Sequence, residues 1–164
     1  MRSLLISLLL TAALSACTTV AEPTGDYTLY LVRHAEKEAG GAKDPALTAA
    51  GKIRAHKLAA LLKNKGISDI WSSDYQRTRN TAAPLAAELG IEVKKYDASD
   101  LKALVSKLEK NRRSALVVGH SNTTPELASL LCNCQVTEMD DTEYDRLLIV
   151  HMQNNNVTVE TLIQ

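Results

Sequence analysis

Short apolar runs alternate with longer amphipathic stretches along this chain. Short runs of aliphatic and β-branched residues are typical of buried strands, and we predict strands at 29–32, 67–73, 91–96 and 115–119. In the stretches between them, apolar residues recur at helical spacing. Helices are therefore predicted from the Thr48 N-cap to Gly66, from the 74–81 segment to Gly90, from about Leu101 onward, and from Pro125 to Leu131.

Two more strands are predicted near the end of the sequence, at 147–152 and 157–162. The turn between them contains Asn154, Asn155 and Asn156, and Asn is favoured in the tight turns of hairpins. Strands that alternate with helices form a mostly parallel sheet with helices on both faces. We therefore expect one α/β domain over residues 27–164, a three-layer α/β/α fold with a C-terminal β-hairpin.

The first residues do not follow this pattern. An apolar run of eleven residues ends at Leu14, which is shorter than the roughly 20 residues of a membrane-spanning helix and typical of a signal peptide over residues 1–16. The run closes with Leu-Ser-Ala-Cys, which resembles the lipobox of bacterial lipoproteins. We expect Cys17 to be lipidated, with 17–26 as a tether. An ordinary cleaved signal with an incidental Cys is the alternative.

The charge composition restricts the classes of partner. The chain carries 19 basic and 19 acidic side chains, so its formal net charge is zero and no overall field favours nucleic acid. An anion must therefore be recognised locally. The lipid on Cys17 would bring the protein to a membrane, and we expect it in the bacterial cell envelope, facing the periplasm.

Candidate catalytic residues lie where predicted strands end. They are Arg33, His34, Arg77 and His120. The carboxyl ends of parallel strands meet at one edge of a sheet, where ligands bind in such folds. Guanidinium groups grip phosphate oxygens, and an imidazole acts as nucleophile or proton carrier. The sequence therefore predicts a cationic pocket for one phosphoryl group, with no metal ion or cofactor.

Two further cysteines, Cys132 and Cys134, follow the last predicted helix. Export to an oxidising compartment permits a disulfide. A bond across a single residue closes a very small ring, however, so we favour two small core residues at a helix end. Two thiols without further ligands are also a poor zinc site.

The polar motifs together resemble the histidine phosphatase superfamily, which has the phosphoglycerate mutase-like fold. They are Leu31-Val32-Arg33-His34-Ala35-Glu36, with Ala where the commonest members have Gly, Leu47-Thr48-Ala49-Ala50-Gly51, the 72–82 segment around Arg77, and Val118-Gly119-His120-Ser121-Asn122. The resemblance covers roughly residues 27–164. It implies a phosphatase that works through a phosphohistidine.

The resemblance also implies roles for individual residues. His34 would be the nucleophile, while Arg33, Arg77 and His120 would bind the phosphoryl oxygens and stabilise the charge of the transition state. Ser121 and Asn122, which follow the second histidine, would contribute to substrate binding.

A proton donor is needed for the leaving oxygen. In much of the superfamily a carboxylate after the third strand supplies this proton, and Asp97 best matches its place. Asp97 could instead be only a helix N-cap, and Asp100 is the rival donor. If no carboxylate reaches the pocket, turnover should favour substrates with good leaving groups, such as phosphohistidine.

The predicted function is a metal-independent phosphatase anchored in the bacterial envelope. There is room for only one helix between the third strand and 115–119, where the resembling mutases carry an insertion that helps to cover the site, so we expect an open site. Its substrate could be a phosphorylated small molecule, a glycolipid or a phosphoprotein. The alternatives are a phosphohistidine or envelope-glycolipid phosphatase, and a non-catalytic lipoprotein that binds phosphate.

Overall fold

The computed structural model describes residues 25–41, 43–153 and 156–164. The predicted signal peptide, Cys17 and most of the predicted tether lie outside the described residues, as do two of the three hairpin asparagines. Across the described ranges, every helix is too short or too polar to cross a membrane.

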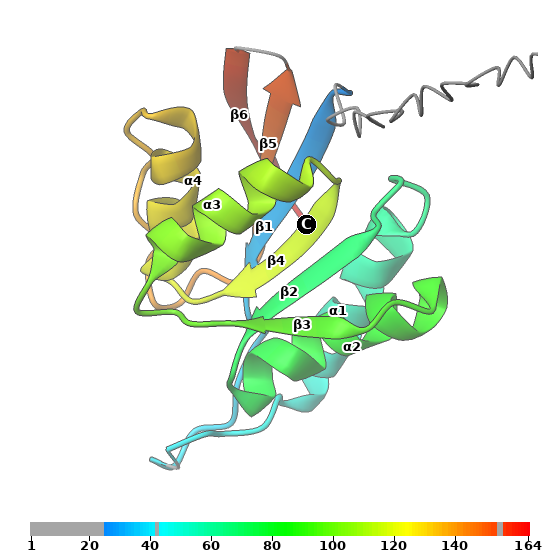
Figure 1. The fold of residues 1–164 in the computed structure, drawn as a ribbon. Helices are drawn as coiled ribbons and strands as arrows, with labels where there is room; N and C mark the ends of the chain where they lie inside the picture. Colours follow the sequence, from blue (N-terminus) through cyan, green and yellow to red (C-terminus); the bar gives the residue numbers. More distant parts are fainter. Residues whose placement is uncertain (1–24, 42, 154–155) are drawn as a thin grey trace, which may run out of the picture.

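Six strands and four helices alternate along the described residues (Figure 1). The strands are β1 (Tyr27–Arg33), β2 (Asp69–Ser73), β3 (Val93–Tyr96), β4 (Ala115–Gly119), β5 (Arg146–Gln153) and β6 (Asn156–Ile163). The helices are α1 (Ala49–Leu62), α2 (Gln76–Leu89), α3 (Leu101–Asn111) and α4 (Thr123–Cys132).

One mixed sheet contains these strands in the order β3-β2-β4-β1-β5-β6. The first four are mutually parallel, β5 runs antiparallel to β1, and β6 pairs with β5 as a hairpin. The predicted α/β fold with a C-terminal hairpin is therefore confirmed. Arg33 of β1 lies in register with Gly119 of β4, so His34 and His120 leave the sheet side by side.

The core is divided into two apolar layers, one on each face of the sheet. Successive side chains of a strand point to opposite faces. In β1, Leu31 therefore packs with the layer under α3 and α4, whereas Val32 packs with the layer under α1 and α2. The two pairs of helices accordingly cover opposite faces of the sheet (Figure 1).

The start of α1 shows why its sequence motif needs a glycine. The Thr48 hydroxyl accepts a hydrogen bond from the Gly51 backbone N–H, as expected of an N-cap. A Cβ atom at position 51 would lie 2.2 Å from the backbone oxygen of Glu36. Only glycine permits this close approach, which presses α1 against the segment after His34.

Two predicted helix boundaries, the end of α1 and the start of α4, were wrong. α1 ends at Leu62, before the predicted Gly66, which lies in the following turn with φ +67°. α3 begins at Leu101, as predicted, and its N-cap is Asp100, whose carboxylate accepts from the backbone N–H of Ala103 at 3.0 Å, so the alternative of Asp97 as the N-cap is wrong. α4 begins at Thr123, two residues before the predicted Pro125.

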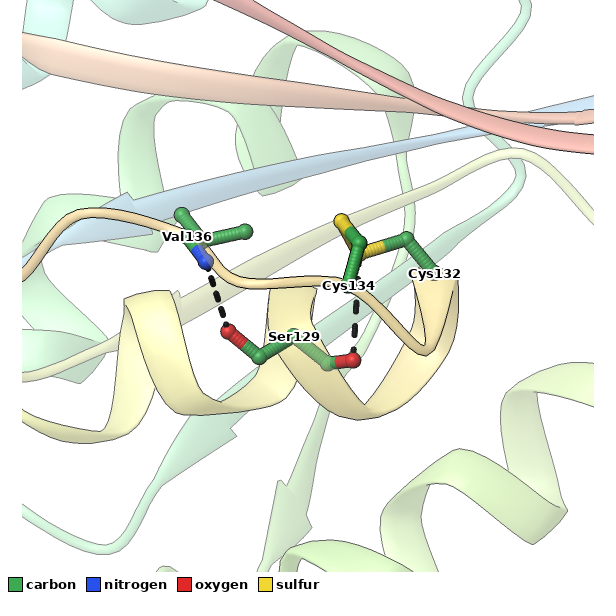
Figure 2. The surroundings of a disulfide bond; sticks show 4 residues. All are labelled: Ser129, Cys132, Cys134 and Val136. Carbon is green, nitrogen blue, oxygen red and sulfur yellow. Dashed lines mark hydrogen bonds between the residues drawn. A yellow bond between two sulfur atoms is a disulfide. The ribbon is translucent and has the colours of Figure 1, made fainter.

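Cys132 and Cys134 form a disulfide, contrary to the expectation of two small core residues (Figure 2). The helix ends at Cys132, and Asn133 then adopts the left-handed conformation with φ 49°, which Asn tolerates better than most residues. This turn brings the two cysteine Cα atoms to 5.1 Å. Cys134 is exposed, so the pair lies at the surface.

Candidate active site

A cavity of about 470 Å³ lies at the carboxyl ends of β1 and β4 and the start of α2. The two arginines and two histidines that the sequence placed at strand ends all line this cavity, together with Ser121 and Asn122 but without Asp97. Its lining consists of Arg33, His34, Lys37, Tyr75, Arg77, Ala98, Ser99, His120, Ser121, Asn122, Thr123 and Asp141.

His34 is buried at the base of the cavity, with 3% of its surface exposed. Its Nδ1 atom lies 2.8 Å from the backbone oxygen of Ala35. Because a carbonyl oxygen only accepts, Nδ1 carries the hydrogen and donates it. Nε2 of the neutral ring therefore carries the lone pair, and this lone pair is the group that a nucleophilic imidazole uses.

Arg33 is buried beside His34 and is fixed from one side by the segment before β5. Its Nη1 atom donates to the backbone oxygens of Asp140, Asp141 and Glu143 at 2.9 to 3.0 Å. The guanidinium also stacks over the ring of Tyr144, 4.2 Å from its centroid. These contacts hold the cation in place before any anion binds.

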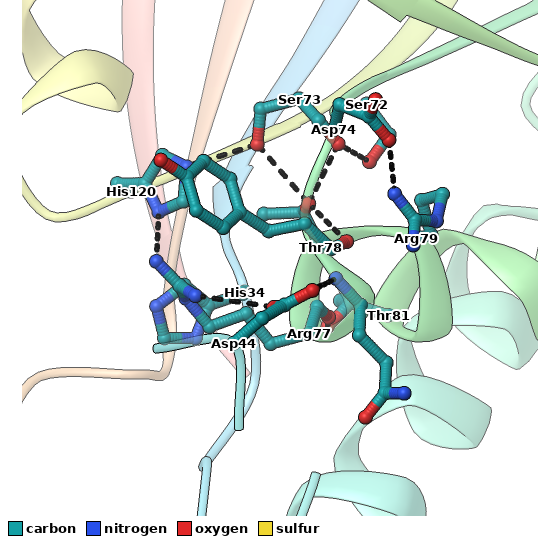
Figure 3. A network of polar contacts seen from close by, with 12 residues as sticks. His34, Asp44, Ser72, Ser73, Asp74, Arg77, Thr78, Arg79, Thr81 and His120 are labelled. Atoms are coloured by element: carbon teal, nitrogen blue, oxygen red, sulfur yellow. Dashed lines mark hydrogen bonds and ion pairs between the residues drawn. The ribbon is translucent and has the colours of Figure 1, made fainter. Parts of the chain in front are cut away.

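Arg77 enters the cavity from the first turn of α2, as predicted. Its Nη2 atom lies 3.5 Å from Nδ1 of His120 (Figure 3). Its guanidinium stacks on the ring of Tyr75. Asp44 pairs with Arg77 at 3.5 Å and also accepts from the backbone N–H of Gln76 at the helix N-terminus. No sequence pattern singled out Asp44.

His120 faces His34 across the cavity, with 5.6 Å between the ring centroids. Its Nε2 atom lies 2.9 Å from Oγ of Ser73, and its ring meets that of Tyr75 edge-on at 5.1 Å. Ser73 is fully buried and is a further member of the site that sequence reasoning did not single out. The feature of the sequence that could have identified Ser73 is its place in the 72–82 motif.

Both histidines are held in the neutral form. Burial, followed by the charges of Arg33 and Arg77, lowers the pKa of His34 to about 4 against the opposing effect of its bond to Ala35. Burial and the same two arginines lower the pKa of His120 to about 4. Near neutral pH, each ring therefore keeps an unprotonated nitrogen.

Asp97 does not reach the cavity, contrary to the position expected of a proton donor. It lies in an adjoining hollow of about 730 Å³, where its carboxylate accepts from the backbone N–H and the hydroxyl of Ser99. These bonds lower the pKa of Asp97, whereas a carboxylic acid that donates needs a raised one. The loop instead turns Ala98 and Ser99 toward the cavity.

Asp141 is the acidic residue among those that line the cavity, and no sequence pattern pointed to it. Its carboxylate accepts from the Ser121 hydroxyl at 3.1 Å and lies 3.8 Å from Nη2 of Arg33. The residue is 108 positions from Arg33 along the chain, so only the tertiary fold brings the two together.

The cavity opens sideways into two more hollows. It shares Tyr75, Ala98 and Ser99 with the hollow that contains Asp97, and Ser121 and Asn122 with another hollow of about 470 Å³ beside α4. The three hollows therefore adjoin one another, and Arg33 and Arg77 line the central one. This shape agrees with the open site expected from the single helix between β3 and β4.

Among the described residues, no three His, Cys, Asp or Glu side chains gather in a way that could hold a metal ion. The positively charged side chains that line the cavity are those of Arg33, Arg77 and Lys37.

Comparisons with known proteins agree with this geometry. Residues 29–102 match the model of the histidine phosphatase superfamily (branch 1). Over this segment the chain is similar in sequence to the histidine phosphatase superfamily. The matched segment includes Arg33, His34 and Arg77 but ends before His120, which joins the site through the fold.

Curated relatives match over part of their length. The "Probable phosphoglycerate mutase GpmB" of Escherichia coli is 34% identical over 107 residues, which cover 62% of this chain and 49% of that protein. The protein of the same name from Shigella boydii matches to the same extent. The chain thus spans about half the length of these relatives.

Solved structures share the fold over most of the chain. The protein histidine phosphatase SixA complexed with tungstate has a TM-score of 0.69 at 18% identity, covering 83% of this chain and 96% of SixA. A mycobacterial glucosyl-3-phosphoglycerate phosphatase has a TM-score of 0.63 at 15% identity, covering 85% of this chain and 98% of that one.

Proposed function

We propose that this protein is a phosphatase that hydrolyses phosphomonoesters through a phosphohistidine at His34. The observation that carries the proposal is the state of His34. Its Nδ1–H is committed to the Ala35 carbonyl, and its Nε2 lone pair belongs to a neutral ring in a cavity that Arg33 and Arg77 also line. A neutral imidazole is a competent nucleophile toward phosphorus.

Arg33 and Arg77 suit the stabilisation of the phosphoryl group. Phosphoryl transfer depends mainly on positioning and on charge stabilisation by fixed groups. Both guanidiniums are already held by stacking on tyrosine rings. The Nε atom of each is also buried without a hydrogen-bond partner in the structure. A phosphoryl oxygen is an acceptor that would satisfy such donors.

The names of similar proteins support the same chemistry. SixA is named as a protein histidine phosphatase and was solved with tungstate, an oxyanion that resembles phosphate in charge and shape. The mycobacterial neighbour is named as a phosphatase of a phosphoglycerate derivative. Both names describe enzymes that act on a phosphorylated substrate.

Trapping the phosphoenzyme tests the proposal. We expect the protein, mixed with p-nitrophenyl phosphate and quenched in alkali, to carry one phosphoryl group on His34 in a peptide mass map. His34→Ala should lose both the label and the turnover, whereas His56→Ala, at an exposed position on α1, should retain both. Undiminished turnover by His34→Ala would exclude the mechanism. Phosphate binding without a phosphoenzyme would instead favour a non-catalytic binding protein.

A second candidate, removal of phosphate from protein histidine, is favoured by the position of Asp97. With that carboxylate outside the cavity, substrates whose leaving group needs little protonation gain an advantage. The open site also accommodates a phosphorylated side chain on a protein surface. Comparing kcat/KM for a phosphohistidine protein, an envelope glycolipid phosphate and a small alkyl phosphate would rank the three substrate classes.

We also propose that the enzyme is a lipoprotein of the bacterial envelope that works without a metal ion. The Leu-Ser-Ala-Cys sequence that ends at Cys17 supports the anchor, and the two arginines supply charge that a metal would otherwise provide. Cys17→Ser should release the protein from the membrane fraction. Full activity should persist in EDTA, and a loss that Mg²⁺ or Zn²⁺ restores would contradict metal independence.

A further inference from the structure

Three hydrogen bonds, two buried and one partly buried, form a chain that ends at His120 (Figure 3). Oγ1 of Thr78 lies 2.9 Å from the backbone oxygens of both Ser73 and Tyr75. Carbonyl oxygens only accept, so the single hydroxyl hydrogen of Thr78 is shared between them. Oγ1 of Thr78 therefore acts as an acceptor toward its other neighbour.

That neighbour is the Ser73 hydroxyl, whose Oγ lies 3.1 Å from Oγ1 of Thr78 and donates to it. Oγ of Ser73 also lies 2.9 Å from Nε2 of His120. Because the serine hydrogen is already used, Nε2–H of His120 is the donor in this contact. Ser73 and Thr78 are fully buried, so water does not compete for the bond between their hydroxyl groups.

This series of hydrogen bonds thus selects one tautomer of His120. The hydrogen of the neutral ring is on Nε2, and the lone pair is on Nδ1, the atom that lies 3.5 Å from Nη2 of Arg77. A lone pair repels an unprotonated phosphate oxygen but accepts the proton of a phosphate hydroxyl. A phosphomonoester loses its second proton at a pKa of about 6, so about a tenth of it still carries that proton at pH 7.

We propose that Ser73, held by Thr78, is a positioning residue that keeps Nδ1 of His120 available, so that His120 takes the proton of the bound phosphomonoester monoanion and delivers it to the leaving oxygen. This inference rests on the proposed function. It assigns to an imidazole the proton transfer for which the cavity offers no carboxylate from the loop after β3.

The charged and titratable groups around His120 favour a temporary protonation. They are Arg77 from α2, Arg33 and His34 from the end of β1, Tyr75 from the turn before α2, and Asp141, which lies against Arg33. Burial and the two arginines keep the pKa of His120 at about 4 before substrate binds. The negative charge of a bound phosphoryl group opposes this effect and raises the pKa of His120 during the reaction.

The transfer balances in both halves of the reaction. In the first, Nε2 of His34 bonds to phosphorus, the bond to the leaving oxygen breaks with its electron pair on that oxygen, and the proton on Nδ1 of His120 moves there. In the second, a water oxygen bonds to phosphorus, one water proton goes to Nδ1, and the P–N electron pair returns to His34. Phosphate then takes this proton back and leaves as its monoanion.

The test compares substrates that differ in how much they need the proton. Ser73→Ala leaves Nε2 without its acceptor, so the tautomer is no longer selected. We expect kcat/KM to fall roughly a hundredfold for glycerol phosphate, whose alkoxide must be protonated, and much less for p-nitrophenyl phosphate. Ser72→Ala is the matched control, because Ser72 is equally buried and adjacent but bonds to the Ser73 carbonyl. It should leave the ratio of the two substrates unchanged.

A second readout does not depend on activity. The ¹⁵N chemical shifts of His120 should report hydrogen on Nε2 in the native protein and a mixture of tautomers in Ser73→Ala. Thr78→Val, a nearly isosteric change, should alter the substrate dependence of kcat/KM and the ¹⁵N shifts of His120 in the same direction as Ser73→Ala. It replaces Ser73→Ala as the test variant if Ser73→Ala does not fold. An equal loss on both substrates, or an unchanged tautomer, would overturn the inference while the native phosphoenzyme remained intact. Absence of a phosphoenzyme in the native protein would defeat the proposed function itself.

Discussion

The floor and the rim of the cavity are built differently. The floor consists of Arg33, His34, Ser73, Arg77 and His120. Its side chains are held by hydrogen bonds to the backbone, by contacts with one another and by stacking on tyrosine rings. The rim, residues 97–99 and 133–145, carries exposed carboxylates that bond to their own loops, such as Asp97 to Ser99 and Asp140 to Thr142. The difference indicates that the phosphoryl group is recognised by a preorganised floor, whereas the rest of the substrate meets an open rim.

The largest effect should come from removing a cation of the floor. Arg77→Ala should lower kcat/KM for p-nitrophenyl phosphate by roughly 10²- to 10³-fold, because a fixed donor to the transition state is lost. Steady-state kinetics would measure this. Arg79→Ala is the control, since Arg79 lies two residues along the same helix but pairs with Asp74 outside the cavity. Similar losses in both variants would show that the floor has no special role.

The floor should also determine how stability depends on pH. Histidines in the unfolded chain titrate near 6.5, whereas His34 and His120 titrate at about 4 in the folded protein. Between these pH values the unfolded chain binds more protons, so the free energy of unfolding should fall as the pH falls from 6.5 to 4. Above 6.5 the two residues should contribute no pH dependence.

Denaturant unfolding at several pH values would measure this slope. The double variant His34→Asn/His120→Asn should have a shallower slope between pH 6.5 and 4, whatever its absolute stability. His56→Asn, an exposed position, should retain the native slope. Equal slopes in the double variant and the native protein would contradict neutral histidines in the floor.

A smaller effect is expected from the disulfide at the start of the rim. Cys132 and Cys134 enclose a loop of three residues, for which the loop-entropy relation gives about 1.6 kcal/mol of stabilisation. Replacing both by Ser should lower the free energy of unfolding by about that amount and leave kcat/KM nearly unchanged. Activity that depends on the disulfide would show that the rim also positions the floor, through the segment that holds Arg33.

The smallest effect on activity is expected at Asp97. Asp97→Asn should leave kcat/KM unchanged for both alkyl and aryl phosphates, because its carboxylate lies in the adjoining hollow. Asp100→Ala should instead cost about 1 kcal/mol of stability through loss of the α3 N-cap, with activity retained. A selective loss on alkyl phosphates in Asp97→Asn would restore Asp97 as the proton donor.

The sequence by itself determined the strand ends and therefore the positions of Arg33, His34, Arg77 and His120. Apolar runs define where strands stop, and parallel strands bring their carboxyl ends to one edge whatever the side-chain details. The same local reasoning identified Thr48 as an N-cap, because a cap depends only on residues within one helical turn.

Only the tertiary structure decided the partners of these residues. The bond from His120 to Ser73 joins β4 to β2, and the contact of Arg33 with Asp141 joins residues 108 positions apart. The direction of Asp97 depends on a turn that its own carboxylate forms with Ser99, and the disulfide depends on the left-handed backbone of Asn133. Local pattern predicts where an element ends, but the orientation of a loop side chain is set by contacts from distant segments.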